Sequence, residues 1–98
     1  MHQLPFGAQM TDTLFRVVEQ ADKESSFYAR GYIPSFSEFG AMGRVLSWTS
    51  RAQAQPGRIF AVDGLEVCVS HDEEVQFRGR VLDWAEGTGV VLRDPWGT

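Results

Sequence analysis

The sequence predicts an α+β domain in which an N-terminal helix packs on a curved antiparallel sheet of four or five strands. Three observations support this prediction. Apolar residues recur at helical spacing between residues 11 and 32, apolar and polar residues alternate after residue 57, and turn residues separate the alternating runs. A small open barrel is the nearest variant of this architecture.

The chain has 98 residues, which is enough for one domain, and its 43% hydrophobic and 22% charged residues are typical of a soluble protein. Residues 1–10 contain neither the basic flank nor the apolar run of a signal peptide. We therefore expect a flexible leader over residues 1–10 and a single domain over residues 11–98. No run reaches the roughly 18 apolar residues of a membrane helix, so no membrane association is expected.

The charge of the chain bears on its partners and its location. The formal net charge is −4, and the nine Lys and Arg residues are scattered, with only Arg78 and Arg80 close together. A phosphate backbone requires a basic face, so we expect no nucleic-acid partner. The lone Cys68 excludes an internal disulfide, and together with the missing signal peptide it favours a cytoplasmic protein.

Residues 11–32 form the best helix candidate. Apolar and small side chains follow the i, i+3, i+4, i+7 pattern at Leu14, Val17, Val18, Ala21, Ser25 and Tyr28. Thr11 or Asp12 can cap this helix, and Gly31 can end it. The alternative is a strand over residues 14–19 followed by a short helix over residues 22–30. We favour one helix.

The segment over residues 35–49 allows two interpretations. Ser35–Glu38 matches a capping box, which would begin a helix. However, Gly40 and Gly43 would lie inside that helix, each costing about 1 kcal/mol relative to Ala. The alternative is a short helical turn followed by a strand over Arg44–Thr49, and we favour this strand.

A near-repeat supports the strand. GRVLSW at residues 43–48 recurs as GRVLDW at residues 79–84, and more loosely as GRIF at residues 57–60. Gly followed by Arg and a β-branched or apolar residue suits the start of a strand, whereas the unmatched flanks argue against a duplicated functional unit. If both copies are strands, Leu46 shares a face with Trp48, and Leu82 shares a face with Trp84.

The C-terminal half reads as an antiparallel meander. Asp63-Gly64 is a strong signal for a two-residue hairpin between strands at residues 58–62 and 65–70. Residues 75–82 alternate and predict another strand, and the Gly-rich turn at residues 86–89 leads to a last strand at residues 90–93.

Two features could carry chemistry in this half of the chain. His71-Asp72-Glu73-Glu74 groups one imidazole with three carboxylates, but four consecutive residues cannot all face one ion. We interpret them as a solvated loop and expect neither a metal nor a cofactor. Cys68 lacks a defined base and orienting group, so we expect a packed structural thiol.

Aromatic residues are the most suggestive candidates for binding. The chain contains seven Phe, three Trp and two Tyr, which is many for its size. Either they cover the open face of the sheet or some of them line a pocket or a self-association surface. The expected ligand-binding residues are Tyr28, Tyr32, Trp48 and Trp84.

The stretch Arg93-Asp94-Pro95-Trp96-Gly97 resembles the Arg-Asp-Pro-x-Gly turn near the end of modules in the glyoxalase/bleomycin-resistance family. The resemblance covers about a tenth of the chain, and no site residue is transferred from it. Asp, Pro and Gly at these spacings are also the pattern of a type I turn.

The sequence therefore predicts a small non-enzymatic binding or protein-interaction module that forms a homodimer. The dimer is expected because long edge strands can pair across a two-fold axis. The alternative is a pocket for a small apolar ligand, or a small enzyme, with an aromatic-lined site between the helix and the sheet.

Overall fold

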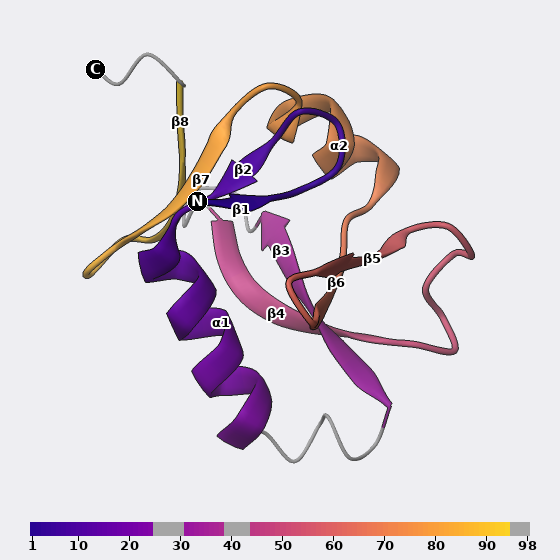
Figure 1. Ribbon diagram of the computed structural model, residues 1–98. Helices are drawn as coiled ribbons and strands as arrows, with labels where there is room; N and C mark the ends of the chain where they lie inside the picture. Colours follow the sequence, from indigo (N-terminus) through magenta and orange to yellow (C-terminus); the bar gives the residue numbers. More distant parts are fainter. Residues whose placement is uncertain (25–30, 39–43, 95–98) are drawn as a thin grey trace.

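The computed structural model describes residues 1–24, 31–38 and 44–94, which form two helices and one eight-stranded sheet (Figure 1). The elements are β1 (His2–Gln3), β2 (Gln9–Met10), α1 (Asp12–Glu24), β3 (Tyr32–Glu38), β4 (Arg44–Ser50), β5 (Ile59–Val62), β6 (Leu65–Cys68), α2 (His71–Phe77), β7 (Val81–Ala85) and β8 (Gly89–Arg93). The strand order is β1-β2-β7-β8-β4-β3-β6-β5. The α+β class is confirmed.

The sheet is larger and more closed than the sequence predicts. It has eight strands rather than four or five, and β2–β7 and β3–β6 pair in parallel. Its two edges approach each other through side chains. His2 Nδ1 lies 2.5 Å from Asp63 Oδ2, and the rings of Phe6 and Phe60 meet edge to face at 5.3 Å. The result is a nearly closed barrel.

Residues 1–10 are part of this barrel, so the prediction of a flexible leader is wrong. Gln9 and Met10 pair with Val81 and Leu82, and Leu4, Ala8 and Met10 are buried in the core. The sequence gives no periodic signal here because β1 and β2 have only two residues each. Such short strands show neither alternation nor helical spacing.

Helix α1 spans Asp12–Glu24, which confirms the choice of a helix over residues 14–19, and Tyr32 belongs to β3 rather than to the predicted helix. Thr11 caps it by accepting a hydrogen bond from Leu14 N at 3.2 Å, and Thr11 Oγ1 donates to Asp83 Oδ1 at 2.7 Å. Leu14, Phe15 and Val18 face the core. Residues 25–30, which include Tyr28, lie outside the described residues.

Strand β4 confirms the favoured interpretation of residues 44–49, whereas a helix start at Ser35–Glu38 is wrong. These four residues belong to β3, which pairs with β4 without interruption from Tyr32↔Ser50 to Glu38↔Arg44. Seven cross-strand pairs outweigh one local capping preference. The regular ladder also places Leu46 and Trp48 on one face of β4, as the near-repeat predicts.

The structure contains both predicted hairpins, but the segment between them differs from the prediction. Asp63 and Gly64 have φ angles of 50° and 86° and join β5 to β6, and β7 and β8 form the last hairpin. The predicted polar loop at residues 71–74 and the first part of the strand predicted at residues 75–82 are wrong, because helix α2 spans them. In this helix Phe77 is 1% exposed, whereas Val75 is 68% exposed.

Replacing a buried residue of the N-terminal segment tests the corrected role of residues 1–10. Leu4→Ala should lower the free energy of unfolding by about 2–5 kcal/mol, because Leu4 lies in the core. Gln3→Ala, at an exposed neighbouring position, should change it by less than about 0.5 kcal/mol. Urea denaturation measures both, and equal stabilities of the two variants would contradict this packing.

Asp83 links the start of α1 to the sheet, and it should make stability depend on pH. Hydrogen bonds from Thr11 and then Arg93 hold the pKa of Asp83 below its usual range. Its stabilising contribution is therefore complete above about pH 4 and is lost as the pH falls through the lowered folded-state pKa.

Asp83→Asn should lower stability near neutral pH and reduce the loss of stability below about pH 4. Asp94→Asn is the matched control, because Asp94 is exposed and its Oδ1 makes a long ion pair with Arg80 Nε, at 3.9 Å. Thermal unfolding between pH 2 and pH 7 compares them, and identical pH profiles of the two variants would argue against the role of Asp83.

Candidate functional site

The three predicted aromatic residues that the structure describes lie on three strands of the sheet, and β8 separates Trp84 from Tyr32 and Trp48. Tyr32 begins β3, Trp48 lies in β4 opposite Pro34, and Trp84 lies in β7 with β8 between it and β4. Trp84 packs against the core and donates its Nε1–H to Glu86 at 3.2 Å. Ligand binding by Tyr28, Tyr32, Trp48 and Trp84 stays a prediction.

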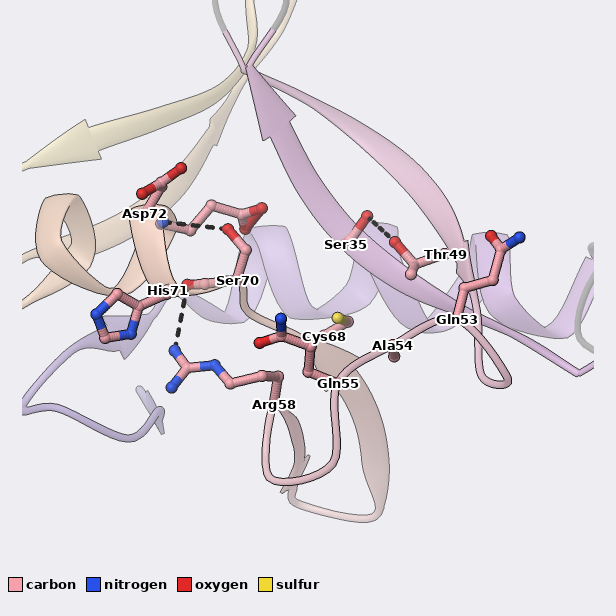
Figure 2. A pocket seen from close by; sticks show the side chains of 11 residues that line it. Ser35, Thr49, Gln53, Ala54, Gln55, Arg58, Cys68, Ser70, His71 and Asp72 are labelled. Atoms are coloured by element: carbon pink, nitrogen blue, oxygen red, sulfur yellow. Dashed lines mark hydrogen bonds between the residues drawn. The ribbon is translucent and has the colours of Figure 1, made fainter.

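A polar pocket lies where β3, β4 and β6 meet residues 53–58 and the start of α2 (Figure 2). Its volume is about 360 Å³. Hydroxyl, amide, thiol and charged side chains form most of its wall. The lining residues are Ser35, Thr49, Gln53, Ala54, Gln55, Arg58, Cys68, Ser70, His71, Asp72 and Glu73.

Hydroxyl groups form the sheet side of this pocket. Ser35 is 3% exposed, and its Oγ accepts a hydrogen bond from Thr49 Oγ1 at 3.0 Å and lies 2.9 Å from Ser47 Oγ. A buried serine requires such partners, because an unpaired hydroxyl loses its hydration without compensation. These bonds hold Ser35 and Thr49 in fixed positions on the wall.

Cys68 lies beside Ser35, with which it is in register across the parallel β3–β6 pair. It is 7% exposed, and burial raises the pKa of its thiol, with a further contribution from the charge of Glu73. Because only the thiolate is a strong nucleophile, Cys68 is unreactive at neutral pH. Its position fits the expected structural thiol.

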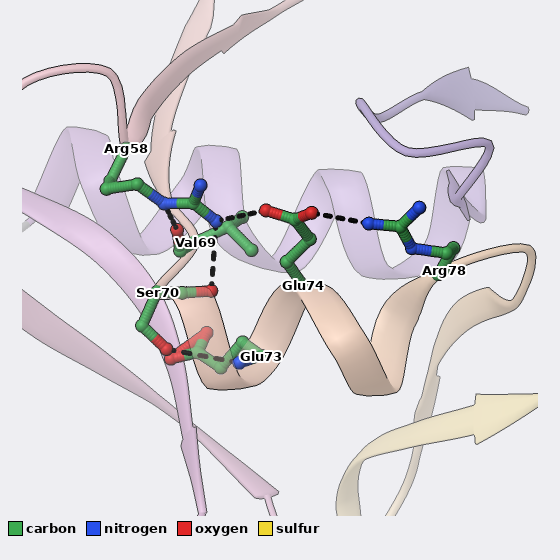
Figure 3. A network of polar contacts seen from close by, with 6 residues as sticks. All are labelled: Arg58, Val69, Ser70, Glu73, Glu74 and Arg78. Carbon is green, nitrogen blue, oxygen red and sulfur yellow. Dashed lines mark hydrogen bonds and ion pairs between the residues drawn. The ribbon is translucent and has the colours of Figure 1, made fainter.

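Arg58 holds the lower side of the pocket through several elements at once (Figure 3). Its Nε donates to Val69 O at 3.0 Å, and its Nη2 donates to Ser70 O at 3.2 Å and to Glu74 Oε1 at 2.7 Å. The guanidinium also lies 5.6 Å from the centre of the Phe6 ring. Arg58 therefore faces the pocket with its Nε and Nη2 donors already engaged by the protein.

Glu74 and Glu73 are adjacent in α2 but experience opposite environments. Glu74 pairs with Arg58 and with Arg78 Nη2 at 2.6 Å, and the hydrogen bond from Arg58 lowers the pKa of Glu74. Glu73 Oε2 is buried without a hydrogen-bond partner among the described residues. Burial raises the pKa of Glu73, and it outweighs the opposing effects of Ser70, Arg44 and Arg58.

The sequence prediction missed this site because it placed residues 71–74 in a solvated loop. The signal that identifies the helix is Ser70-x-x-Glu73, which is a capping-box pattern. Ser70 Oγ accepts from Glu73 N at 3.2 Å, so half of that box is formed. The helix turns Glu73 toward the pocket while His71 and Asp72 remain exposed.

Metal binding has no geometric support in the part of the chain that the structure describes. There, no three His, Cys, Asp or Glu side chains are grouped so that they could hold a metal ion. His71 and its acidic neighbours therefore do not converge on one point.

The comparisons with known proteins identify the fold but not the activity. No protein-family model matches the chain, and no curated relative matches it. A protein from Aquifex aeolicus, solved by NMR in structural genomics, superimposes with a TM-score of 0.63 at 19% identity, over 97% of this chain and 100% of that one. At this identity the likeness shows a shared fold alone. Neither helix in the described residues is long and apolar enough to cross a membrane.

The two glutamates give a stability test with opposite expected signs. The raised pKa of Glu73 means that the folded state binds its proton more tightly than the unfolded state does. Stability from this group is therefore present below about pH 4.3 and lost as the pH rises through the folded-state pKa. For Glu74, the lowered pKa means that its stabilising contribution is present above about pH 4.3 and is lost as the pH falls through the folded-state pKa.

At pH 7, Glu73→Gln should raise the melting temperature, because glutamine has nearly the same shape as glutamate but lacks its desolvated charge. Glu74→Gln should lower it, because two arginines lose their partner. Calorimetry on the two variants and the parent chain decides the point. A loss of stability in both variants would show that Glu73 is an ordinary paired carboxylate.

Proposed function

We propose that this domain is a non-enzymatic binding module for a small polar molecule, held in the pocket between the sheet and α2. The observation that carries the proposal is a pocket of about 360 Å³ lined by the half-buried Glu73, one of whose carboxyl oxygens, Oε2, is enclosed without a hydrogen-bond partner among the described residues. Ligand pockets generally measure about 300–1,000 Å³ and use a few fixed polar groups for specificity. The fixed groups in this pocket are Ser35, Thr49 and Glu73.

A non-enzymatic role is favoured because the buried thiol of Cys68 is protonated at neutral pH. The alternative that the structure supports is a small enzyme that uses Glu73 as a general acid. The raised pKa of Glu73 favours this second candidate, since general acids work best with a pKa near the working pH. Both candidates use the same pocket.

Self-association and the cytoplasmic location remain parts of the proposal. The long open edge that motivated the dimer is reduced, because β1 and β5 are short and their side chains approach each other. A dimer would therefore need another surface. The buried free thiol of Cys68 fits a reducing compartment.

Screening with small polar compounds tests the proposal directly. At millimolar concentrations, a library of amides, polyols, amino acids and amines should contain members that shift the backbone ¹H–¹⁵N signals of Ser35, Thr49, Cys68 and Ser70. The proposal fails if no compound shifts these signals.

Thr49→Val should weaken binding of a compound found in this way by roughly 2- to 12-fold, the value of one hydrogen bond. Thr13→Val, at an exposed position of α1, is the matched control and should leave the affinity unchanged. Equal affinities of the two variants would place the ligand away from the hydroxyl wall.

A further inference from the structure

The pocket wall carries two acidic side chains and one guanidinium group. Asp72 and Glu73 contribute carboxylates, whereas the guanidinium of Arg58 is bound to Glu74 and to two backbone carbonyl oxygens. Figure 3 shows the side chain of Arg58 extending toward Glu74 rather than toward Glu73. A ligand that enters therefore meets acceptor groups and the carboxyl group of Glu73, whose burial the charges of Arg44 and Arg58 offset only in part.

Four residues act on Glu73, and its Oε2 still has no hydrogen-bond partner among the described residues. Ser70 caps the helix below it, Cys68 lies on β6, and the charges of Arg44 and Arg58 act on it from β4 and from the segment before β5. Arg44 donates to Phe36 O at 3.2 Å and lies 4.9 Å from the centre of the Phe77 ring. The two arginines offset the burial of Glu73 only in part.

We propose that the ligand carries an ammonium or guanidinium group that lies against the carboxylate of Glu73, and this inference rests on the proposed function. Such a group adds positive charge beside Glu73, and a charge-assisted hydrogen bond is stronger than a neutral one. Its remaining N–H donors meet the oxygens of Thr49, Gln53 and Gln55 on the same wall.

Proton release upon binding follows from this arrangement. In the empty pocket, burial disfavours the charge of Glu73 and raises its pKa, whereas a bound cation favours the carboxylate. Affinity should therefore increase as the pH rises through the pKa of Glu73 in the free protein, and then level off. A neutral ligand that accepts a hydrogen bond from the protonated carboxyl group would show the opposite dependence.

The experiment compares cationic probes with a neutral one of matched length. Agmatine and putrescine should shift the ¹H–¹⁵N signals of Thr49, Cys68 and Ser70 in the full chain, and 1,4-butanediol should shift them at least 10-fold more weakly. Glu73→Gln should weaken binding of both amines at least 10-fold. Glu24→Gln, at an exposed position of α1, should leave binding unchanged.

Measurements on the unsubstituted chain keep the inference testable whatever the variants do. Putrescine affinity should rise between pH 4 and pH 7, and calorimetry in two buffers of different ionisation enthalpy should show proton release. Affinity that falls with pH, or Glu73→Gln that retains amine binding, overturns the inference. If only neutral compounds bind in the pocket, the proposed function stands and the cationic ligand is wrong. If no probe binds there, both fail.

Discussion

The placement of Arg58 is the constraint on which the barrel and its pocket depend. One guanidinium group binds the carbonyl oxygens that follow β6, pairs with Glu74 of α2 and lies over the ring of Phe6. It therefore joins the N-terminal segment, the sheet and the second helix at a single point, with its side chain largely buried. Arg58 pairs with Glu74, whereas the enclosed oxygen of the adjacent Glu73 has no hydrogen-bond partner among the described residues.

Stability alone does not readily explain why Glu74 is paired with arginine while an oxygen of Glu73 is enclosed without a partner. A domain selected only to fold would place an apolar or amide side chain at position 73, since a desolvated carboxyl group opposes folding. Local arrangements that oppose folding are commonly found at functional sites, where binding or catalysis compensates for them. Neighbouring carboxyl groups whose pKa values are shifted in opposite directions are a common sign of such a site.

The sequence predicts features that depend on neighbouring residues and misses those that depend on distant contacts. The Asp63-Gly64 hairpin and the first helix follow from local turn and spacing rules. The two-residue strand at Met10 carries no such signal, because pairing with β7 alone defines it. At Phe77, alternation with Val75 suggested a strand, although only Phe77 is buried and the cap at Ser70 begins a helix. The pocket was missed for the same reason.

The central claim is that one enclosed oxygen of Glu73, Oε2, has no hydrogen-bond partner while Arg58 holds Glu74. A ¹³C NMR titration of the side-chain carboxyl carbons, on labelled protein without ligand, tests it directly. The account predicts that Glu73 titrates above the ordinary glutamate midpoint of about 4.3 and Glu74 below it. A midpoint for Glu73 at or below that of Glu74 would contradict the account.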